Sequence, residues 1–528
     1  MELIEKQKYI YELVKKADMG IFTIAGFAGT GKTITVAEIT KLKKFKNILC
    51  VAPTASALAV LKNKIPTAQK NKTIKFTTLS SLIDTPTEVF KFANQVFYLD
   101  PDLGDKDKLY ALFAALKLPT EIITEGKKIV KFKNGNIAEK PLLKINEHLL
   151  QQSLTEQGYT QLKDFQVDAA FITKSVESIV EELAPYDLIP IDEASMVNAE
   201  SMELLEKAIN TIHEKRNSML LVCGDPGQAE PIEGGLNKYM DPEYTDDKKV
   251  TLTKILRSDD DVAQVGYDIR IGGKLPLLAL KYNNIKVINN DLRAFINKYK
   301  QDLMAADVTL AFKNKTVNQL NAAIRALKGF SGPVSVNEKV VVHQNSGYKS
   351  NGSIAFANGD ILTVKEVMPF DAGAKFYEDT INEVIEKENI NNILSDSVKI
   401  RTKASIELIK AYLQKGDFLV VNLVNRLGEA KHAVVLNNLD LTQKSAIHND
   451  VIAMLNDVTT LTSSATLPYV KAGYGYAITI HKAQGSEWDK VVVVALASDY
   501  YLYKTPNVLY TAATRAKKEM AIYYLNEQ

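Results

Sequence analysis

Gly26-Phe27-Ala28-Gly29-Thr30-Gly31-Lys32-Thr33 decides the fold of this chain. The stretch matches the phosphate-binding loop pattern G-x-x-x-x-G-K-[ST] at every fixed position. Residues 21–25 before it are a short apolar, β-branched run that predicts a buried strand, and apolar residues recur at helical spacing after it. A Gly-rich turn that binds nothing is the alternative, but a strand and a helix flank the loop as phosphate binding requires. The stretch therefore predicts a nucleotide-phosphate site on an α/β sheet.

The loop itself is expected to supply the contacts to the nucleotide. Lys32 is expected to lie against the β- and γ-phosphates, and the Thr33 hydroxyl is expected to ligate Mg²⁺. Glycines allow successive backbone N–H groups to face an anion at the start of a helix. The nucleotide-binding residues predicted in the loop are Gly26, Ala28, Gly29, Thr30, Gly31, Lys32 and Thr33.

Composition restricts the class of protein. At 528 residues the chain is too long for one core, and 46% hydrophobic and 24% charged residues are ordinary globular values. The net charge of +2 means that a nucleic-acid-binding surface would need its positive charge concentrated locally. Cys50 and Cys223 lie in apolar runs, which predicts buried, unpaired thiols in a reducing compartment. No signal peptide and no 18-residue apolar run occur, so we expect a soluble, cytoplasmic protein without a membrane partner.

The first helix is expected over residues 2–18. Its predicted apolar side is Leu3, Tyr9, Ile10, Leu13 and Val14. Gln7 lies on the same helix ahead of the phosphate loop, and it is either a surface side chain or a contact to adenine.

Two later strand ends carry the residues that triphosphate hydrolysis needs. A short strand over residues 187–191 delivers Asp192 and Glu193, and a strand over residues 219–223 leads to Gln228. Asp192 would hold Mg²⁺, Glu193 would polarise the attacking water, and Gln228 could bond the γ-phosphate or that water. The remaining requirement is positive charge on the transferring phosphoryl group, which distant arginines Arg257 and Arg515 could supply.

The alternation of strands and helices is interrupted at residues 85–180 and 331–471. Within the first interruption, residues 127–137 alternate around Asn134-Gly135, which predicts a β-hairpin. The hairpin is basic and carries Phe132 near its tip, so it is either a solvated surface feature or a nucleic-acid contact. The second interruption predicts a small β module with strands near residues 338–342, 361–367, 418–423 and 433–436, a turn at 358–360 and a helical excursion at 376–414.

Six ordered motifs resemble those of superfamily 1 helicases. They are residues 26–33, 192–196, 224–228, 252–258, 479–487 and 510–515, and the forms Asp-Glu-Ala-Ser and Gly-Asp-Pro-x-Gln are similar to the RecD and Dda branch. The resemblance implies an α/β fold with two RecA-like parallel-sheet motor domains in tandem, each with an inserted subdomain. The implied boundaries are 1–84 with 181–256 for the first motor domain, 257–330 with 472–528 for the second, an 85–180 insertion with a pin hairpin, and a 331–471 insertion that is SH3-like.

The resemblance also implies roles for single residues. It implies that Gln7 reads adenine, that Gly485 and Glu487 contact the nucleotide, and that Arg257 and Arg515 are arginine fingers. Positions implied along the DNA strand are Pro53, Thr54, Thr78, Thr479 and His481, with a structural hydrogen bond as the alternative for His481. The family's third motif usually continues Leu-Pro-Pro, whereas Ala229-Glu230-Pro231 stands here, which puts the coupling role of that loop in doubt.

The favoured function is an ATP-dependent DNA helicase that moves 5′-to-3′, with ATP and Mg²⁺ as cofactors, and the direction rests on the resemblance alone. Its expected partners are single-stranded DNA and single/double-strand junctions, and a single-strand-binding protein or replisome component is a candidate partner of a protein active as a monomer. An RNA helicase or non-unwinding translocase is one alternative, since no motif reveals a 2′-OH reader. A hydrolysis-deficient DNA-binding module is the other, and the intact Lys32, Glu193, Arg257 and Arg515 argue against it.

Overall fold

The computed structural model describes residues 3–65, 72–92, 95–98, 123–131, 137–145, 165–231, 234–255, 260–343, 346–348, 354–356, 358–387, 407, 409–425, 428–437, 439, 467–499 and 506–526. The chain forms two compact units, Met1–Leu82 with Val176–Gln528, and Ile83–Ser175. Among the helices of these described stretches, none has the length and apolar character needed to cross a membrane.

The first sheet has six parallel strands, and the phosphate loop follows one of them. Its order is β11 (Lys249–Leu252), β1 (Gly20–Gly26), β10 (Met219–Gly224), β9 (Leu188–Ile191), β2 (Asn47–Ala52) and β3 (Thr73–Thr78). Every residue of β9 and β10 is buried, as expected for central strands of a parallel sheet that is covered on both faces. Because β1 and β9 both flank β10, their carboxyl ends bring three of the predicted motifs to one edge.

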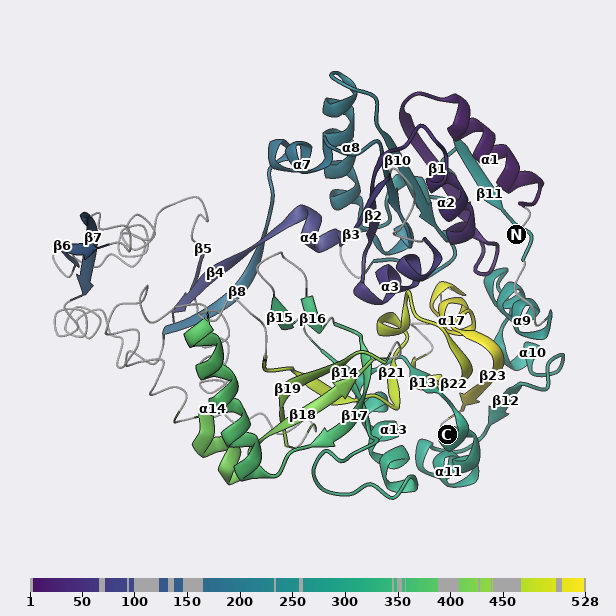
Figure 1. Cartoon of the computed structure of the whole chain (residues 1–528). Coiled ribbons are helices and arrows are strands. Elements are labelled where there is room, and N and C mark those ends of the chain that lie inside the picture. The colour runs from purple at the N-terminus through teal and green to yellow at the C-terminus, as the bar shows by residue number, and fades with distance from the viewer. Residues whose placement is uncertain are drawn as a thin grey trace. The chain divides into compact units, whose positions relative to one another are not determined.

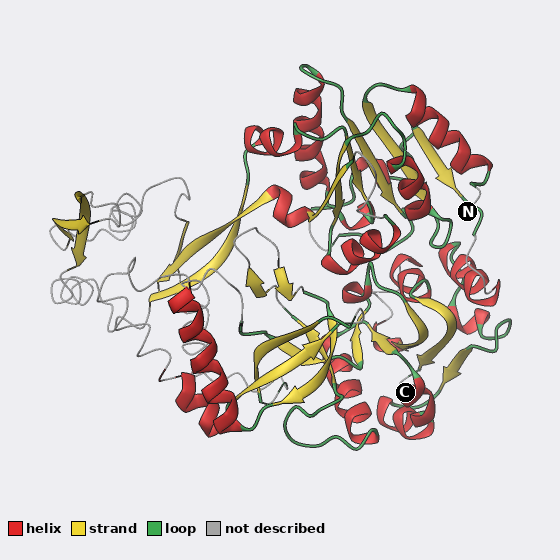
Figure 2. Ribbon diagram, viewed as in Figure 1, coloured by secondary structure: helices red, strands yellow, loops and turns green. Residues whose placement is uncertain are grey.

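Helices flank the strands of this sheet (Figures 1 and 2). They are α1 (Glu5–Lys16), α2 (Lys32–Thr40), α3 (Ala55–Lys64), α4 (Leu79–Ile83), α7 (Val176–Leu183) and α8 (Ala199–His213), with short 3₁₀ turns η3 (Ala194–Met196) and η4 (Lys238–Met240). We call these helices with the first sheet the first lobe. Ile10 and Val14 of α1 pack with Val36 and Ile39 of α2 in one core cluster. This cluster covers one face of the sheet next to the phosphate loop.

The second parallel sheet has five strands, in the order β12 (Ile285–Ile288), β23 (Ala516–Leu525), β22 (Trp488–Leu496), β13 (Val308–Ala311) and β21 (Ala477–Thr479). Its helices are α9 (Asp260–Arg270), α10 (Leu275–Leu278), α11 (Leu292–Lys298), α12 (Lys300–Ala305), α13 (Asn314–Leu327) and α17 (Pro506–Ala513), with the 3₁₀ turn η6 (His481–Ala483). We call this set the second lobe. Two parallel α/β sheets confirm the predicted fold class.

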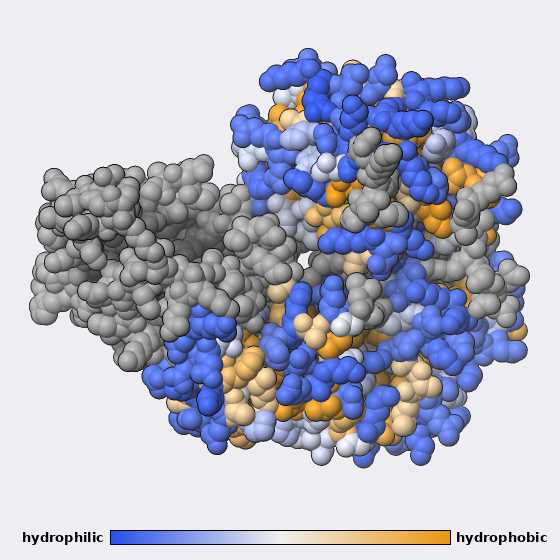
Figure 3. Space-filling view, viewed as in Figure 1, coloured by the Kyte–Doolittle hydropathy of each residue, from blue (hydrophilic) through white to orange (hydrophobic). Residues whose placement is uncertain are grey.

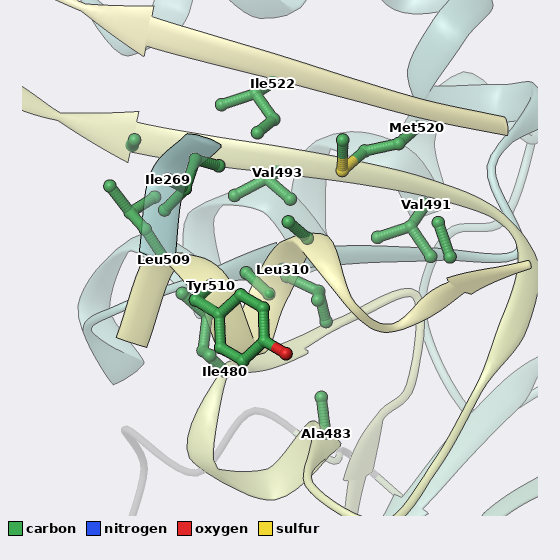
Figure 4. Close-up of a cluster of buried hydrophobic side chains, with 14 of the residues drawn as sticks. Ile269, Leu310, Ile480, Ala483, Val491, Val493, Leu509, Tyr510, Met520 and Ile522 are labelled. Atoms are coloured by element: carbon green, nitrogen blue, oxygen red, sulfur yellow. The ribbon is translucent and has the colours of Figure 1, made fainter. Parts of the chain in front are cut away.

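A large apolar cluster joins α9 and α17 to the second sheet (Figure 4). Ile269 of α9 and Leu509 of α17 pack with Val493 and Ile522 of the strands, and Tyr510 lies among them. Trp488 is buried in the same cluster. Burial on this scale fixes α9 and α17 to the sheet, so residues at their ends move with the second lobe.

A third sheet is antiparallel, in the order β19 (Ala430–Leu436), β18 (Phe418–Val424), β17 (Ile361–Val367), β14 (Lys339–Val342) and β20 (Ala472–Tyr474). A small pair, β15 (Ser346–Tyr348) with β16 (Ile354–Phe356), lies between β14 and β17 in the chain, and α14 (Phe370–Lys387) packs on β18. The four predicted strands of the β module and the turn at 358–360 are present. Helical residues occur at 370–387, 407 and 409–415, and residues 388–406 and 408 of the predicted helical excursion lie outside the described residues.

The second unit contains a three-stranded antiparallel sheet and a separate hairpin. The sheet is β5 (Gln95–Tyr98), β4 (Asp84–Phe92) and β8 (Phe165–Thr173), and the hairpin is β6 (Ile123–Lys131) with β7 (Ile137–Ile145). Lys131 pairs with Ile137, which confirms a hairpin at the predicted place. Phe132 and Asn134-Gly135 lie outside the described residues, and the domain boundaries above stay predictions.

Hydrophilic residues cover most of the face of the described part that Figure 3 shows, with hydrophobic residues scattered between them.

The first helix brings one correction. Tyr9 was expected on the apolar side of the first helix, but it is 56% exposed. The buried positions are Gln7, Ile10 and Val14, spaced three and four apart, and Tyr9 points about 100° away from Ile10 around the helix.

Candidate active site

The phosphate loop has the backbone that its sequence predicts. Gly29 and Gly31 have φ of 78° and 80°, a region that glycine adopts without steric cost, and Gly31 directly precedes α2. Lys32 Nζ donates to the carbonyl oxygens of Gly26 at 2.9 Å and Phe27 at 3.0 Å. The ammonium group therefore lies folded onto its own loop, at the place where phosphate oxygens would compete for it.

The two carboxylates after β9 face the loop. Thr33 Oγ1 donates to Asp192 Oδ2 at 2.9 Å, and the Glu193 backbone N–H donates to Asp192 Oδ1 at 3.1 Å. Burial raises the pKa of the Asp192 carboxyl, while the bond from Thr33 and the charge of Lys32 oppose that rise. The site thus joins a hydroxyl and a carboxylate, which are ligands that Mg²⁺ accepts.

Glu193 is held in an unusual backbone conformation. Its φ of 52° and ψ of 41° lie in the left-handed region, which residues other than glycine seldom adopt. Burial raises the pKa of the Glu193 carboxyl, and the charge of Arg515 is the main opposing influence. Its Oε2 is buried without a hydrogen-bond partner. A carboxylate that is strained, desolvated and unpaired has the features expected of a proton acceptor.

The loop after β10 adds an amide to this place. Gln228 is 3% exposed, and its Oε1 also lacks a hydrogen-bond partner. Asp225, three residues earlier, is completely buried and its Oδ1 accepts from the Gly227 backbone N–H at 3.0 Å. Burying an amide oxygen without a partner is costly, which indicates that a ligand completes the site.

The second lobe supplies Arg515. Its guanidinium is 2% exposed and donates to the carbonyl oxygens of Thr511 at 3.0 Å and Ser486 at 3.2 Å. The positive charge of Arg515 lowers the pKa of Glu193. The negative charge of Glu487 raises the pKa of Asp192. Arg257 lies outside the described residues, so its predicted role stays a prediction.

Gln7 contacts the phosphate loop itself. Its Nε2 donates to the Thr30 carbonyl oxygen at 3.0 Å, and its Oε1 accepts from the Ile4 backbone N–H at 3.0 Å. Both ends of the amide are therefore used within the protein. The predicted contact to adenine stays a prediction.

The residues predicted along a DNA strand fall into three places. Thr54 accepts from the Ala57 backbone N–H at the start of α3, and a Cβ on Gly485 would lie 3.2 Å from Thr54 Oγ1. Thr78 contacts Ser81 at 2.8 Å at the start of α4, in the first lobe. Pro53 lies beside Thr54 after β2, also in the first lobe. The third place is in the second lobe, where Thr479 ends β21 and His481 begins η6.

Sequence reasoning missed a set of residues that join the two lobes. Tyr510 Oη accepts from the Ala28 backbone N–H at 3.0 Å and donates to Asp225 Oδ2 at 2.7 Å. Arg270, at the end of α9, forms an ion pair with Asp225. Tyr510 stood in a quoted motif without a role, and Arg270 stands in none, so only the fold reveals their contacts.

The loop that departs from the family pattern takes part in the same junction. The Ala229 backbone N–H donates to Thr511 Oγ1 at 2.8 Å, and the Ala229 carbonyl oxygen accepts from Gln484 Nε2 at 3.0 Å. Glu230, the acidic residue that raised the doubt, is exposed. The loop therefore contacts the second lobe through backbone atoms of Ala229. These contacts do not depend on the side chains in which the loop departs from the family pattern.

The residues present fit a nucleotide with a magnesium ion. Glu193 and Gln228 leave buried oxygens unpaired, Lys32 has only carbonyl partners, and Thr33 and Asp192 lie within hydrogen-bond distance of one another. In the described part of the chain, no group of three or more His, Cys, Asp or Glu side chains is arranged to hold a metal. A metal at this place would therefore need oxygen ligands from outside the protein, as Mg²⁺ bound to a triphosphate has.

Two domain-family models match parts of this chain. The model of an AAA domain matches residues 11–233, and the model of a UvrD-like helicase C-terminal domain matches residues 474–523. The RecD subunit of the RecBCD enzyme of Buchnera aphidicola subsp. Schizaphis graminum is 22% identical over 444 residues, which are 78% of this chain and 68% of that protein. Together with the six ordered motifs, these matches support a superfamily 1 helicase of the RecD type. The resemblance carried by the six motifs is thereby confirmed.

Two other proteins are similar to this helicase over nearly its whole length. The uncharacterized protein R530 of Acanthamoeba polyphaga mimivirus is 22% identical over 559 residues, covering 97% of each chain. A crystal structure of Bacteroides Pif1 bound to ssDNA matches with a TM-score of 0.46 and 14% identity, covering 99% of this chain and 92% of that one.

Proposed function

We propose that this helicase hydrolyses Mg-ATP between its two lobes and uses the energy to move 5′-to-3′ along single-stranded DNA and separate the duplex ahead. The convergence of charges on Glu193 carries the proposal. Lys32 and Asp192 of the first lobe and Arg515 of the second lobe all act on that one buried carboxyl. Hydrolysis needs these groups together, and neither lobe holds them all.

Each side chain has a definite task in this proposal. Lys32 would leave its carbonyl partners to hold the β- and γ-phosphates, and Thr33 with Asp192 would hold Mg²⁺. Bound Mg-ATP supplies the phosphoryl group and the metal charge that offsets its negative oxygens. Glu193 would accept a proton from the attacking water through its unpaired Oε2. Gln228 would orient that water through its unpaired Oε1.

Arg515 makes hydrolysis depend on the second lobe. An arginine finger contributes roughly 10³- to 10⁵-fold in rate. Its guanidinium is held by backbone carbonyl oxygens of the second lobe, so a change in the angle between the lobes would move it away from Glu193. ATP would close the lobes and product release would open them. Repeated closure is the basis of the proposed movement.

The nucleic-acid track is proposed to follow Pro53, Thr54 and Thr78 in the first lobe and Thr479 and His481 in the second. These residues lie at carboxyl ends of parallel strands or just after them, where open α/β sheets bind ligands. A Cβ on Gly485 would lie 3.2 Å from Thr54 Oγ1, so the segment after η6 in the second lobe approaches the residues after β2 in the first, which supports a track shared by both lobes. A strand held by both lobes would be pulled when the lobes change their angle.

The test is ATP hydrolysis measured with and without single-stranded DNA. We expect stimulation by DNA in the wild-type protein and loss of hydrolysis in Lys32→Ala. Lys41→Ala is the matched control, because Lys41 is an exposed lysine just after α2. Unchanged hydrolysis in Lys32→Ala would refute the proposed site. Loss in both variants would point to damage to α2 instead.

A further inference from the structure

Arg270 is a partly buried cation that belongs to the second lobe and contacts the first. It is the last residue of α9, and Ile269 beside it packs against the second sheet. Its side chain is 19% exposed, and Nη1 donates to Asp225 Oδ1 in the loop after β10. The Asp225 side chain is completely buried. A charge pair with so little solvent stays in place only while its geometry and remaining hydrogen bonds are satisfied.

Two aromatic rings hold the guanidinium. Its carbon lies 4.2 Å from the ring centroid of Phe27 in the phosphate loop and 5.1 Å from that of Tyr510 in α17. Both distances are within the range of a cation–π interaction. Arg270 therefore contacts the phosphate loop, the loop after β10 and α17 at once.

The Asp225 carboxylate that pairs with Arg270 also accepts hydrogen bonds from two other groups. Its Oδ1 also accepts from the Gly227 backbone N–H at 3.0 Å, and its Oδ2 accepts from Tyr510 Oη at 2.7 Å. A Cβ on Gly227 would collide with the Arg270 guanidinium, so the turn that leads to Gln228 is shaped around this arginine. Tyr510 Oη in turn accepts from the Ala28 backbone N–H of the phosphate loop.

We propose that Arg270 is a positioning residue for the proposed hydrolysis. Through Asp225 it fixes the turn that presents Gln228, and through Tyr510 it fixes the phosphate loop against the second lobe. This inference rests on the proposed function, because it concerns the same site. Arg270 touches neither the nucleotide-phosphate residue Lys32 nor Glu193 in any described contact, so it acts through Asp225 and Tyr510 rather than on the reacting atoms.

The kinetic test uses conservative variants with a matched control. Arg270→Lys keeps the charge but not the planar stack on Phe27 and Tyr510, and Tyr510→Phe keeps the buried ring but loses the hydroxyl. Both are expected to lower kcat by about tenfold, as loss of a hydrogen bond to a charged group does, with KM for ATP changed less. Arg293→Gln, an exposed arginine on α11 of the second lobe, should leave both values unchanged.

A double-mutant cycle separates positioning from general support of the fold. Arg270→Gln and Asp225→Asn each remove one end of the ion pair. If they act through one contact, the double variant should be no slower than the slower single variant. Multiplied effects on kcat would overturn the proposal.

A second readout needs no hydrolysis. Cys50 and Cys223 are buried, so cysteines introduced by Lys207→Cys on α8 and Leu280→Cys after α10 can be labelled selectively for energy transfer between the lobes. In nucleotide-free protein, Arg270→Lys and Tyr510→Phe should broaden the transfer distribution relative to wild type and Arg293→Gln. An unchanged distribution together with unchanged kcat would overturn the inference. If the wild-type protein fails to hydrolyse ATP, the proposed function is wrong, and the energy-transfer result alone then decides whether Arg270 positions the lobes.

Discussion

Glu193 is a strained residue of the candidate site. A residue other than glycine in the left-handed region costs about 1–3 kcal/mol, and Glu193 also buries an oxygen without a partner. A strained conformation of this kind persists only where the surrounding structure imposes it. The fully buried strand β9 before Glu193 and the turn η3 after it impose the conformation of this residue. The strain directs the carboxyl toward the junction of the lobes, where Arg515 acts on it.

Glu193→Gln should separate chemistry from binding. The amide keeps the size of the side chain but cannot accept a proton, so we expect kcat for ATP hydrolysis to fall by about 10²- to 10⁴-fold. Nucleotide affinity, measured by titration calorimetry, should change little. Glu200→Gln on α8, which replaces an exposed glutamate, is the control. A variant with near wild-type kcat would remove Glu193 from the proposed mechanism.

Glu193→Gly should make the protein more stable and inactive. Glycine adopts φ of 52° without cost and removes the unpaired carboxylate oxygen, so we expect a gain of about 1 kcal/mol in the free energy of unfolding. Denaturant titration of both proteins measures this difference. A clear loss of stability would show that the carboxyl makes stabilising contacts that outweigh its strain.

Sequence patterns predicted the residues of the site better than their contacts. A fixed motif specified Lys32 and Thr33, because phosphate binding requires these residue types at this spacing. Arg270 could not be found in this way, since it stands in an ordinary amphipathic helix and matters only because α9 ends beside Asp225. Gln7 shows a related limit, because its bonds to the phosphate loop depend on the angle between α1 and β1.

At the scale of elements, β14 and η6 meet through a pair of basic side chains. Lys482 Nζ of η6 donates to His343 Nδ1 just after β14, and Lys471 adds a further charge nearby. Burial of the ring, followed by the charges of Lys482 and Lys471, lowers the pKa of His343 to about 4. The neutral imidazole is therefore part of the contact between the β module and the second lobe.

Acid should weaken this contact. The unfolded chain binds a proton at His343 below about pH 6.5, whereas the folded chain does so only near pH 4, so stability is full above pH 6.5 and is lost as the pH falls toward 4. The full shift corresponds to about 3 kcal/mol, which solvent at the partly exposed ring reduces. Denaturant unfolding of wild type and His343→Asn across this range measures the difference. Parallel pH profiles for the two proteins would contradict the prediction.

The sequence predicts a nucleic-acid contact at Phe132, which lies between β6 and β7 in the chain. We propose that Phe132 there separates the strands of the duplex, since a ring can stack on a base. Phe132→Ala should then impair unwinding more than DNA-stimulated hydrolysis, as measured on one forked substrate. Phe370→Ala, at an exposed phenylalanine that begins α14, is the control. Equal loss of both activities would assign the hairpin to folding or to general binding.

Elements were predictable wherever local pattern and burial agreed. The apolar runs of β1, β9 and β10 are buried on both faces, so their residue types alone indicate central parallel strands. Tyr9 was predicted on the wrong side of α1 because only Gln7, Ile10 and Val14 of this helix are buried. A helical wheel drawn from the sequence shows the apolar face of a helix but not which part of that face the rest of the protein covers. The pairing of β14 with β20, more than a hundred residues away, follows from no local signal.

For the complete chain, the proposed site draws on both lobes, whereas the direction of the proposed movement follows from no residue contact. Both lobes contribute strand ends to the proposed track, and the order in which they grip and release the strand sets the direction. A protein that walks 5′-to-3′ loads on a single-stranded tail and reaches the junction only when that tail ends in 5′. Family resemblance alone supports this direction here.

Unwinding of tailed duplexes tests direction and substrate together. With ATP and Mg²⁺, we expect strand separation of 5′-tailed DNA, little separation of 3′-tailed DNA and none of a blunt duplex, as followed by release of a labelled strand. Lys32→Ala should be inactive on all three, which ties any separation to hydrolysis instead of binding. RNA versions of the same duplexes should be separated more slowly. Preference for the 3′-tailed DNA would reverse the proposed direction while leaving the shared site of the two lobes in place, whereas preference for RNA would replace the proposed substrate.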